Sequence, residues 1–539
     1  MIRRSTLVCT LTALALTAGC ATTTEATRPA EPAPVVEAPS PAPVRDPRAP
    51  APAEPVPSRP LPTLSPLEVV RLPVPNKPIV SLRLVFRAGS VDDPAGKEGL
   101  TSLTGSVLEE GGTQKLTSAQ LLQALYPIAG DLSVSTDKEL TVFAGRIHRD
   151  NLDAFLEIFT DVLLHPRLDA KEFERLRQDH LNAVKNGLRN EDDERLGKAA
   201  LDAVLYAGHP YRHYPVGTVA GLEAITLEDV RAQWQRVFTQ DRLIVGLAGA
   251  VDEALEQQVL QRLSALPKTG APRVQLPPAP GVHGQVLLIK KQTLSTAISL
   301  GSSYPVRRGD PDFFLLFFAM SYLGEHRQSN GVLFNQLREL RGLNYGDYAY
   351  AEMHHQEGYS SLPATNVARS QQHFSLWLRP VEPDTAMFAT RGAVHFFDAL
   401  IKDGIPAERF EVTRQFLDGF TRLWSQTDQR RLGYAIDSKL YGTPDFLEAY
   451  RAALKTMTPD QVHAALSRHY AADKLNYAYV VQDAEKLKEL LTRQPPTPLT
   501  YTSEKPAQLL AEDQIISARP LPLDPASIQI LDAQQFMQQ

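Results

Sequence analysis

Two segments of the chain, 232 positions apart, share one residue pattern, and this repeat constrains the fold more than any other feature. Residues 225–252 read ITLEDVRAQWQRVFTQDRLIVGLAGAVD, and residues 457–485 read MTPDQVHAALSRHYAADKLNYAYVVQDAE. In each segment a threonine, Thr226 or Thr458, predicts a helix N-cap, and a turn and an apolar strand follow the helix. A helix, a turn and a strand in one shared register predict an internal duplication.

The duplication predicts an α+β fold with two homologous domains, which agrees with a length of 539 residues, too long for one core. We expect an N-terminal domain over residues 67–275 and a C-terminal domain over residues 276–495. The junction lies near the proline-containing stretch from Pro267 to Gly281. Residues 496–539 are expected to form a polar tail.

Residues 1–19 have the features of a secretory signal peptide. MIRR is basic, LVCTLTALAL is apolar but too short to span a membrane, and small residues precede Cys20. The segment from Leu16 to Cys20 resembles a bacterial lipobox, which implies cleavage before Cys20 and a lipid anchor on its thiol. A plain signal peptide with an unrelated cysteine is the alternative. Residues 20–66 are rich in proline and alanine and predict an extended tether.

Cysteine content and charge exclude several classes of site. The chain has two cysteines, Cys9 and Cys20, and Cys9 lies inside the predicted signal peptide. The mature chain therefore offers no thiol nucleophile, internal disulfide or thiolate zinc site. The formal net charge is −6, and no basic stripe with interleaved aromatic residues occurs, so nucleic acid is not an expected partner. No G-x-S-x-G segment supports a hydrolase nucleophile elbow.

Three further segments carry a family resemblance. They are RAGSVDDPAGKEGLTSLTGSVLEEGGT (87–113), YAGHPYRHYPVGTVAGLEAITLEDV (206–230) and GVLFNQLRELRGLNYGDYAY (331–350). Together and in this order they resemble the insulinase/pitrilysin-like metallopeptidases of the M16 family, which include the mitochondrial processing peptidase. The resemblance covers roughly residues 67–495 and implies two peptidase-like α/β sandwich domains.

The resemblance also implies a zinc motif, and this chain lacks its functional residues. Enzymes of the family hold zinc with two histidines of an H-x-x-E-H helix and a downstream glutamate, while the motif's own glutamate acts as general base. In the register of the family motif, Ser102 and Ser106 stand where the two histidines would be. Gly105 stands at the position of the general base, and Ala183 at that of the third ligand. These four degenerate positions imply that this chain holds no metal. We expect Glu109 and Glu110, which follow the motif, to be a solvated or loop pair.

No displaced copy of the motif is evident. His354 in HHQEG is followed by Gly358 where a second histidine would be needed. His209 and His213 in HPYRH are four residues apart, but Pro210 between them argues against a helix. The sequence therefore gives no catalytic residue in this chain.

In the same family, an arginine and a tyrosine seven positions apart face the substrate from the second domain. The segment RELRGLNY supplies Arg338 and Tyr345 at that spacing, so the resemblance implies a substrate-binding pair. Two alternatives remain open. Arg338 could be a surface charge while Tyr345 packs at the start of a strand, or Arg341 could be the relevant arginine if the register shifts by one turn.

The chain lacks the zinc residues of the family but keeps the arginine–tyrosine pair. This difference predicts a catalytically inactive, substrate-binding subunit of a zinc-dependent M16-type peptidase. It would pair with a chain that carries H-x-x-E-H and the zinc, and a peptide would bind by adding a strand to a sheet edge. The alternative is an envelope scaffold or binding protein that keeps the fold without any proteolytic role. A self-sufficient hydrolase with an unrecognised site is a third hypothesis, without support from particular residues.

The expected location is the bacterial cell envelope, with a lipid anchor in the membrane. Ala21 rather than aspartate follows Cys20, a pattern that implies the outer membrane in Gram-negative bacteria, with the protein facing the periplasm.

Overall fold

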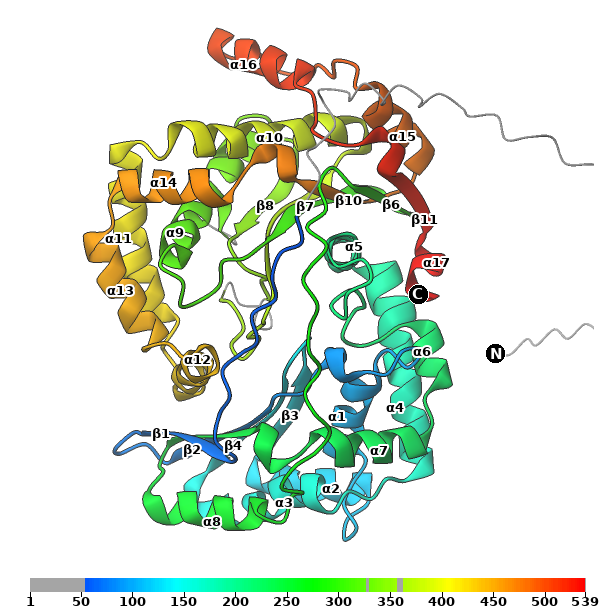
Figure 1. Cartoon of the computed structure of the whole chain (residues 1–539), viewed down its shortest axis with the longest axis vertical. Coiled ribbons are helices and arrows are strands. Elements are labelled where there is room, and N and C mark those ends of the chain that lie inside the picture. The colour runs from blue at the N-terminus through cyan, green and yellow to red at the C-terminus, as the bar shows by residue number, and fades with distance from the viewer. Residues whose placement is uncertain (1–53, 326–328, 356–361, 539) are drawn as a thin grey trace, which may run out of the picture. The chain divides into compact units, whose positions relative to one another are not determined.

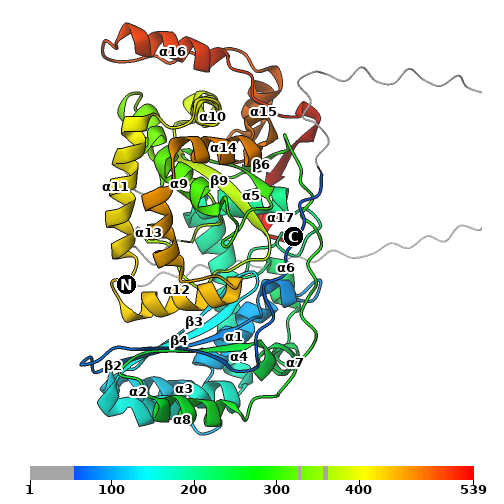
Figure 2. The ribbon, with the colours of Figure 1, turned by 60° about the vertical axis from the view of Figure 1, so that its left-hand side comes forward.

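The computed structural model describes residues 54–325, 329–355 and 362–538. The predicted signal peptide, Cys20 and most of the predicted tether lie outside the described residues. All described elements belong to one compact unit, Pro47–Gln539 (Figures 1 and 2).

Two mixed β-sheets form the frame of this unit, and their strand orders correspond except for one additional edge strand in the second. The first has the order β1-β5-β2-β4-β3 and the second the order β11-β6-β10-β7-β9-β8. The first sheet contains β1 (Glu68–Pro73), β2 (Ile79–Phe86), β3 (Asp131–Thr136), β4 (Thr141–His148) and β5 (Leu243–Gly249). The second contains β6 (Val286–Lys290), β7 (Thr296–Tyr304), β8 (Asn344–Tyr350), β9 (Gln372–Val381), β10 (Asn476–Val481) and β11 (Ile528–Asp532).

Strand pairing shows that the sheets are copies of one unit. β1 pairs with β5 in parallel, as β6 does with β10, and the next three pairs in each sheet are antiparallel. β11 is the strand by which the second sheet exceeds the first. The predicted two-part α+β architecture is therefore confirmed, and each half below is named after its sheet.

Helices surround both sheets. The first half contains α1 (Leu100–Glu110), α2 (Ser118–Leu125), α3 (Leu152–Leu164), α4 (Ala170–Asn182), α5 (Asp193–Leu205), α6 (Val219–Ala224), α7 (Leu227–Val237) and α8 (Glu253–Leu263). The second contains α9 (Phe313–Gly324), α10 (Ala386–Asp403), α11 (Ala407–Leu423), α12 (Asp428–Tyr441), α13 (Phe446–Thr456), α14 (Pro459–His469), α15 (Ala484–Arg493), α16 (Ala507–Ala518) and α17 (Ala533–Gln538). π-Helical segments cover Ala183–Glu191 and Phe334–Glu339. No helix among the described residues is both long and apolar enough to cross a bilayer.

Local signals place the repeated segment. Thr226 and Thr458 are the N-caps of α7 and α14, and each closes a capping box, with Asp229 and Gln461 respectively. In both boxes the threonine hydroxyl accepts from a backbone N–H while the partner side chain accepts from the threonine N–H. A 3₁₀ turn and then β5 or β10 follow, as the repeat predicts.

The two halves exchange a helix (Figures 1 and 2). α5 of the first half packs on the second sheet, where Leu201 shares an apolar cluster with Ile289. α12 of the second half packs on the first sheet, where Ile436 shares a cluster with Ile244. Gly246 permits this close approach, because a Cβ there would lie 2.7 Å from Ile436 Cδ1. Separating the halves would expose both apolar faces to water, which opposes separation.

Both ends of the described chain also tie the halves together. Near the N-terminus, Val56 bridges to Ala279 in the inter-domain connection, and Arg59 pairs with Asp310 of the second half. This segment then continues into β1 (dark blue in Figure 1). At the C-terminus, β11 joins the second sheet and the buried Phe536 of α17 packs in a cluster with first-half helices. The halves are therefore linked at several points.

Candidate functional site

The segment that resembles the zinc motif forms α1, and α1 is a buried packing helix. Leu103 and Val107 are almost completely buried in the apolar cluster shared by α1, α4 and α6. A Cβ on Gly105 would lie 3.2 Å from Val134 Cγ2 of β3, so a larger side chain there would press on that strand. A side chain at the position of the family's general base would therefore require Val134 to shift by a few tenths of an ångström.

Ser106 faces a histidine that sequence reasoning missed. Its Oγ lies 3.0 Å from Nε2 of His180 on α4, and the other ring nitrogen lies 3.4 Å from the Val216 carbonyl oxygen. Burial lowers the pKa of His180, which favours the neutral ring. The motif register indicated Ala183, which is exposed at the start of a π-helical segment. The signal available was helix spacing, since residues three apart share a face.

The residues around α1 do not fit zinc. His180 supplies one imidazole nitrogen, Ser106 a hydroxyl, and Ser102 and Gly105 no strong ligand. Within residues 54–325, 329–355 and 362–538, no group of three or more His, Cys, Asp or Glu side chains is placed to hold a metal ion. No chemical step is therefore assigned to a metal in this chain.

The two acidic residues after the motif differ from each other. Glu110 is exposed and pairs with Arg175 on α4 at 3.0 Å. Glu109 is partly buried, and its burial, together with the charge of Glu110, raises its pKa to about 7. The expectation of a solvated pair therefore holds for Glu110 and is wrong for Glu109.

The other histidines considered from sequence have separate partners. His209 Nε2 lies 3.0 Å from the Pro277 carbonyl oxygen, while His213 pairs with Asp93 at 3.3 Å. His354 stacks on a tyrosine ring at a centroid distance of 4.0 Å. Gly358 of the HHQEG segment lies outside the described residues.

The Arg338–Tyr345 pair comes together at one end of the second sheet. Arg338 lies in the π-helical segment and Tyr345 in β8, the edge strand. The Arg338 guanidinium lies 4.6 Å from the ring centroids of both Phe334 and Tyr345, and its Nη1 donates to the Tyr345 carbonyl oxygen at 3.1 Å. Both side chains line a cavity of about 750 Å³, here named the Arg338 cavity.

The structure bears on the two alternatives for this pair, that Tyr345 packs at the start of its strand or that Arg341 takes the place of Arg338. Tyr345 is 68% exposed, so it does not pack at the start of its strand. Arg341 is buried and forms ion pairs with Glu512 and Asp513 of α16, at 2.5 and 2.7 Å. Arg338, and not Arg341, lines the cavity. The predicted substrate-binding role of Arg338 and Tyr345 stays a prediction.

A buried carboxyl group lies beside this pair. Asp347 of β8 lines the Arg338 cavity and is only 2% exposed. Its Oδ1 accepts from Asn344 Nδ2 at 2.6 Å, while its Oδ2 has no hydrogen-bond partner among the described residues. Burial raises its pKa to about 7, although the nearby Arg338 charge acts in the opposite direction. An under-satisfied carboxyl group at a cavity wall is a feature of binding sites more than of cores.

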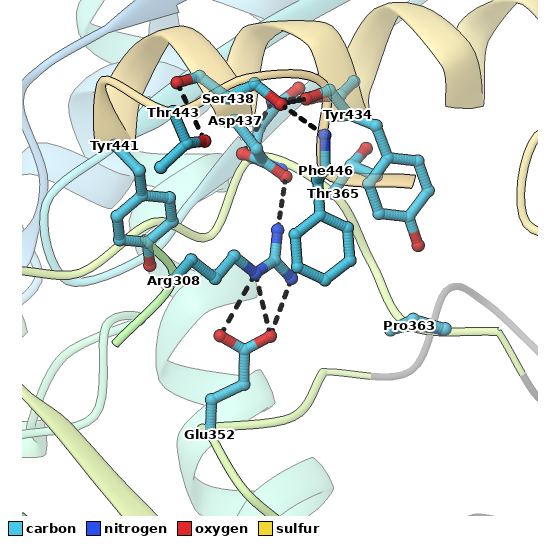
Figure 3. Close-up of polar contacts among 12 residues, drawn as sticks. Arg308, Glu352, Pro363, Thr365, Tyr434, Asp437, Ser438, Tyr441, Thr443 and Phe446 are labelled. Atoms are coloured by element: carbon cyan, nitrogen blue, oxygen red, sulfur yellow. Dashed lines mark hydrogen bonds and ion pairs between the residues drawn. The ribbon is translucent and has the colours of Figure 1, made fainter. Parts of the chain in front are cut away.

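Two buried ionic networks hold the halves in register, and the first is shown in Figure 3. Arg308 donates to Glu352 at 2.7 Å and to Asp437 of α12 at 3.4 Å. Burial alone would lower the pKa of Arg308, but the two carboxylates hold it above its usual value. Asp437 also accepts from the Asn366 backbone N–H at 3.0 Å, and Arg83 of the first sheet contacts Asn366. α12 is thereby fixed between the sheets.

The second network begins at the β3–β4 turn, where three consecutive charged residues are buried or partly buried. Asp137 pairs with Arg369 of the second half at 2.8 Å, and Lys138 donates to the Tyr211 carbonyl oxygen at 2.6 Å. Glu139 accepts from the Ser370 backbone N–H. Sequence reasoning did not identify these residues, because three charges between strands are typical of a solvated turn.

Comparison with known proteins decides the family. Residues 69–210 match the family described as Insulinase (Peptidase family M16), and residues 224–417 match the Peptidase M16 inactive domain. The chain belongs to peptidase family M16. Within this M16 chain, the first match covers Ser102 and Ser106 of α1, and the second covers Arg338 and Tyr345.

Relatives with known sequences are named both as proteases and as non-peptidases. An uncharacterized zinc protease of Mycobacterium bovis is 24% identical over 375 residues, which cover 67% of this chain and 80% of that protein. The non-peptidase homolog YmxG of Helicobacter pylori is 22% identical over 403 residues, covering 74% and 88%. A probable β subunit of the mitochondrial-processing peptidase of Arabidopsis thaliana is 24% identical over 227 residues, covering 41% and 42%.

Solved structures support the fold. A peptidase M16 inactive domain from Pseudomonas fluorescens superposes with a TM-score of 0.67 at 23% identity, covering 78% of this chain and 97% of that one. A protease from Helicobacter pylori superposes with a TM-score of 0.65 at 16% identity, covering 79% and 100%. At these identities the likeness establishes the fold alone.

Proposed function

We propose that this chain is a catalytically inactive, substrate-binding subunit of a zinc-dependent M16 peptidase. The observation that carries the proposal is a difference between two sites. The zinc positions hold Ser102, Gly105, Ser106 and Ala183, whereas Arg338 and Tyr345 lie together on the wall of a large cavity. The name of the YmxG relative as a non-peptidase homolog supports the loss of catalysis.

The proposed partner is an M16 chain that carries H-x-x-E-H and therefore supplies both zinc and general base. The similarity to a subunit of the mitochondrial-processing peptidase supports an assembly of unlike chains. In that assembly, the Arg338 guanidinium and the Tyr345 hydroxyl would donate hydrogen bonds to a carbonyl oxygen of the bound peptide. Donors that are already in place stabilise the negative charge that develops on such an oxygen during hydrolysis.

The peptide would bind as an added strand. β3 and β8 are the edge strands at corresponding ends of the two sheets, and β3 lies against α1. From Leu132 to Thr136, β3 contains neither proline nor a charged residue, the features that usually protect an edge. A main-chain ladder along such an edge binds peptides with little dependence on their sequence.

We also propose that lipid on Cys20 anchors the chain to the outer membrane, facing the periplasm, with residues 20–66 as the tether. Cys20→Ala should move the protein from the membrane fraction to the soluble fraction after cell lysis. Retention of the variant on membranes would contradict the anchor.

The proposed function is tested by measuring metal content and peptide hydrolysis on the purified chain alone. We expect less than roughly a tenth of an equivalent of zinc per chain, because a single imidazole ligand does not hold zinc tightly. We expect no hydrolysis that a chelator inhibits. Stoichiometric zinc, or chelator-sensitive hydrolysis by the chain alone, would refute the proposal. If the chain and its partner together hydrolyse peptide, and Arg338→Ala does not change the rate, the scaffold alternative would be favoured.

A further inference from the structure

A second cavity adjoins the Arg338 cavity. It has a volume of about 410 Å³, lies between the halves, and is here named the Lys198 cavity. Asp192 and Glu194, at the start of α5, line both cavities, so the first turn of this exchanged helix is their common wall. Lys198 and Trp377 of β9 both line this second cavity and contact each other there. The Lys198 Nζ lies over the Trp377 ring, 3.5 Å from the ring centroid.

The common wall carries one carboxylate between two cations. Glu194 forms ion pairs with both Lys198 of its own helix and Arg379 of β9. Each cation also lies over an aromatic ring, since the Arg379 guanidinium is 5.0 Å from the centroid of Tyr348. One carboxylate cannot neutralise two cations, so this wall has a local surplus of positive charge.

The other acidic groups of the Lys198 cavity have cationic partners of their own. Asp192 pairs with Arg195 at 3.4 Å, and Asp202 lies 3.5 Å from Lys138 Nζ. Arg369, which also lines this cavity, pairs with Asp137 at 2.8 Å. The charge of Asp192 also acts on Lys198 and Arg379, so Asp192 and Glu194 together face three cations, Lys198, Arg379 and Arg195, and one positive charge remains in excess. Burial lowers the pKa of Lys198 to about 7, and a bound anion would favour its protonated form.

Hydrogen-bond donors in the same walls lack acceptors. Arg369 Nη1 and Trp377 Nε1 belong to side chains lining the Lys198 cavity, and Arg379 Nε to one lining the Arg338 cavity. None of these buried nitrogens has a hydrogen-bond acceptor among the described residues. Buried polar groups are nearly always paired, so unpaired donors beside a cation surplus indicate a ligand that supplies acceptors and negative charge.

We propose that the Lys198 cavity binds a carboxylate of the peptide held between the halves, with Lys198 as its cation and Trp377 Nε1 as a neighbouring hydrogen-bond donor. The proposal rests on the proposed function, because it takes the ligand to be a peptide. The carboxylate comes either from the peptide's C-terminus or from an acidic side chain. Charge-assisted hydrogen bonds are stronger than neutral ones, so this contact would favour acidic over neutral peptides.

The test measures binding of three N-acetylated octapeptides to the purified full chain by isothermal titration calorimetry. The first ends in phenylalanine with a free carboxylate, the second is its carboxamide, and the third is the carboxamide with glutamate at the seventh position. We expect the first or the third to bind about tenfold more tightly than the second. Preference for the first identifies the C-terminal carboxylate, and preference for the third identifies an acidic side chain.

Variants then assign the preference to Lys198. Lys198→Met keeps the apolar stem but removes the charge, and should abolish the preference without weakening binding of the neutral peptide. Lys198→Arg should restore it, and Lys486→Met, which removes an exposed lysine paired with Asp384, should leave it unchanged.

Equal affinity of all three peptides would overturn the proposal, as would an undiminished preference in a folded Lys198→Met chain or the absence of saturable binding. The proposed function is decided separately, by hydrolysis in the assembled enzyme with and without Arg338. A chain that supports hydrolysis but shows no carboxylate preference would retain the function and lose this site.

Discussion

The α1 region and the Arg338 cavity are the two places where this chain resembles an M16 active site, and they differ in how their polar groups are satisfied. Around α1, Ser106 contacts His180, and a residue larger than glycine at 105 would press on β3. At the Arg338 cavity, Tyr345 is mostly exposed, and one Asp347 oxygen has no hydrogen-bond partner within the described part of the chain. A segment that only packs can lose its metal-coordinating residues, and its remaining polar groups then pair within the protein. A segment that binds a ligand keeps polar groups that are paired only when the ligand is bound.

The largest expected effect tests the claim that α1 serves packing. Leu103→Ala in α1 removes a fully buried side chain, so we expect a loss of about 2–5 kcal/mol in the free energy of unfolding. Chemical denaturation measures it, with Leu510→Ala on the exposed part of α16 as the matched control. A loss no larger than that of the control would show that α1 is not a packing helix.

Next in size is the effect of removing the Arg338 donor. In the assembled enzyme, Arg338→Ala should lower kcat/KM about a hundredfold, because a donor to the reacting carbonyl oxygen would be lost. The thermal midpoint of this chain should stay unchanged, since Arg338 is partly exposed. Arg422→Ala removes another exposed arginine and should leave kcat/KM intact. Equal kcat/KM values for both variants would argue against a role for Arg338 in turnover.

A smaller effect should follow from neutralising Asp347. Its pKa is about 7 in the folded chain and about 4 when unfolded, so the unfolded chain releases this proton first as pH rises. The ionised group therefore lowers stability above pH 7, and the penalty disappears as pH falls towards 4. Asp347→Asn should stabilise the chain by about 1–3 kcal/mol at pH 8 and negligibly near pH 4.

Thermal unfolding across this pH range measures the difference, with the exposed Asp384→Asn as the control. A stabilisation by Asp347→Asn that does not depend on pH would show that the carboxyl group is not strained by burial.

The smallest effect concerns the contact between Ser106 and His180. Ser106→Ala removes the hydrogen bond to His180 and should cost about 1 kcal/mol in the free energy of unfolding. Turnover of the assembled enzyme should not change. A double-mutant cycle with His180→Ala isolates the pair, and a coupling energy of zero would mean that the two side chains do not support each other.

Local features of this fold could be predicted from sequence because they depend on neighbours along the chain. The repeat predicted two related domains, and Thr226 and Thr458 cap their helices as expected. Arg338 and Tyr345, which the family motif singled out together, do contact each other, with the guanidinium 4.6 Å from the tyrosine ring centroid. The two caps rest on spacing within a single helix turn, whereas the duplication rests on a comparison of two segments 232 positions apart.

Features that depend on contacts between distant segments could not be predicted. An amphipathic pattern shows that α5 and α12 each bury a face, but not that each buries it on the sheet of the other half. Composition of the C-terminal segment did not indicate that β11 pairs with β6. His180 was missed because the family register drew attention to Ala183, and only the structure shows which turn of α4 faces Ser106.

The central claim is that this chain lacks catalysis of its own and assists a zinc-bearing relative. The most direct measurement is affinity capture of the tagged full chain from solubilised membranes of its native host, with mass spectrometry of the bound chains and their stoichiometry. The account predicts near-stoichiometric recovery of an M16 chain that carries H-x-x-E-H. Recovery of this chain alone, or only with unrelated envelope proteins, would contradict it.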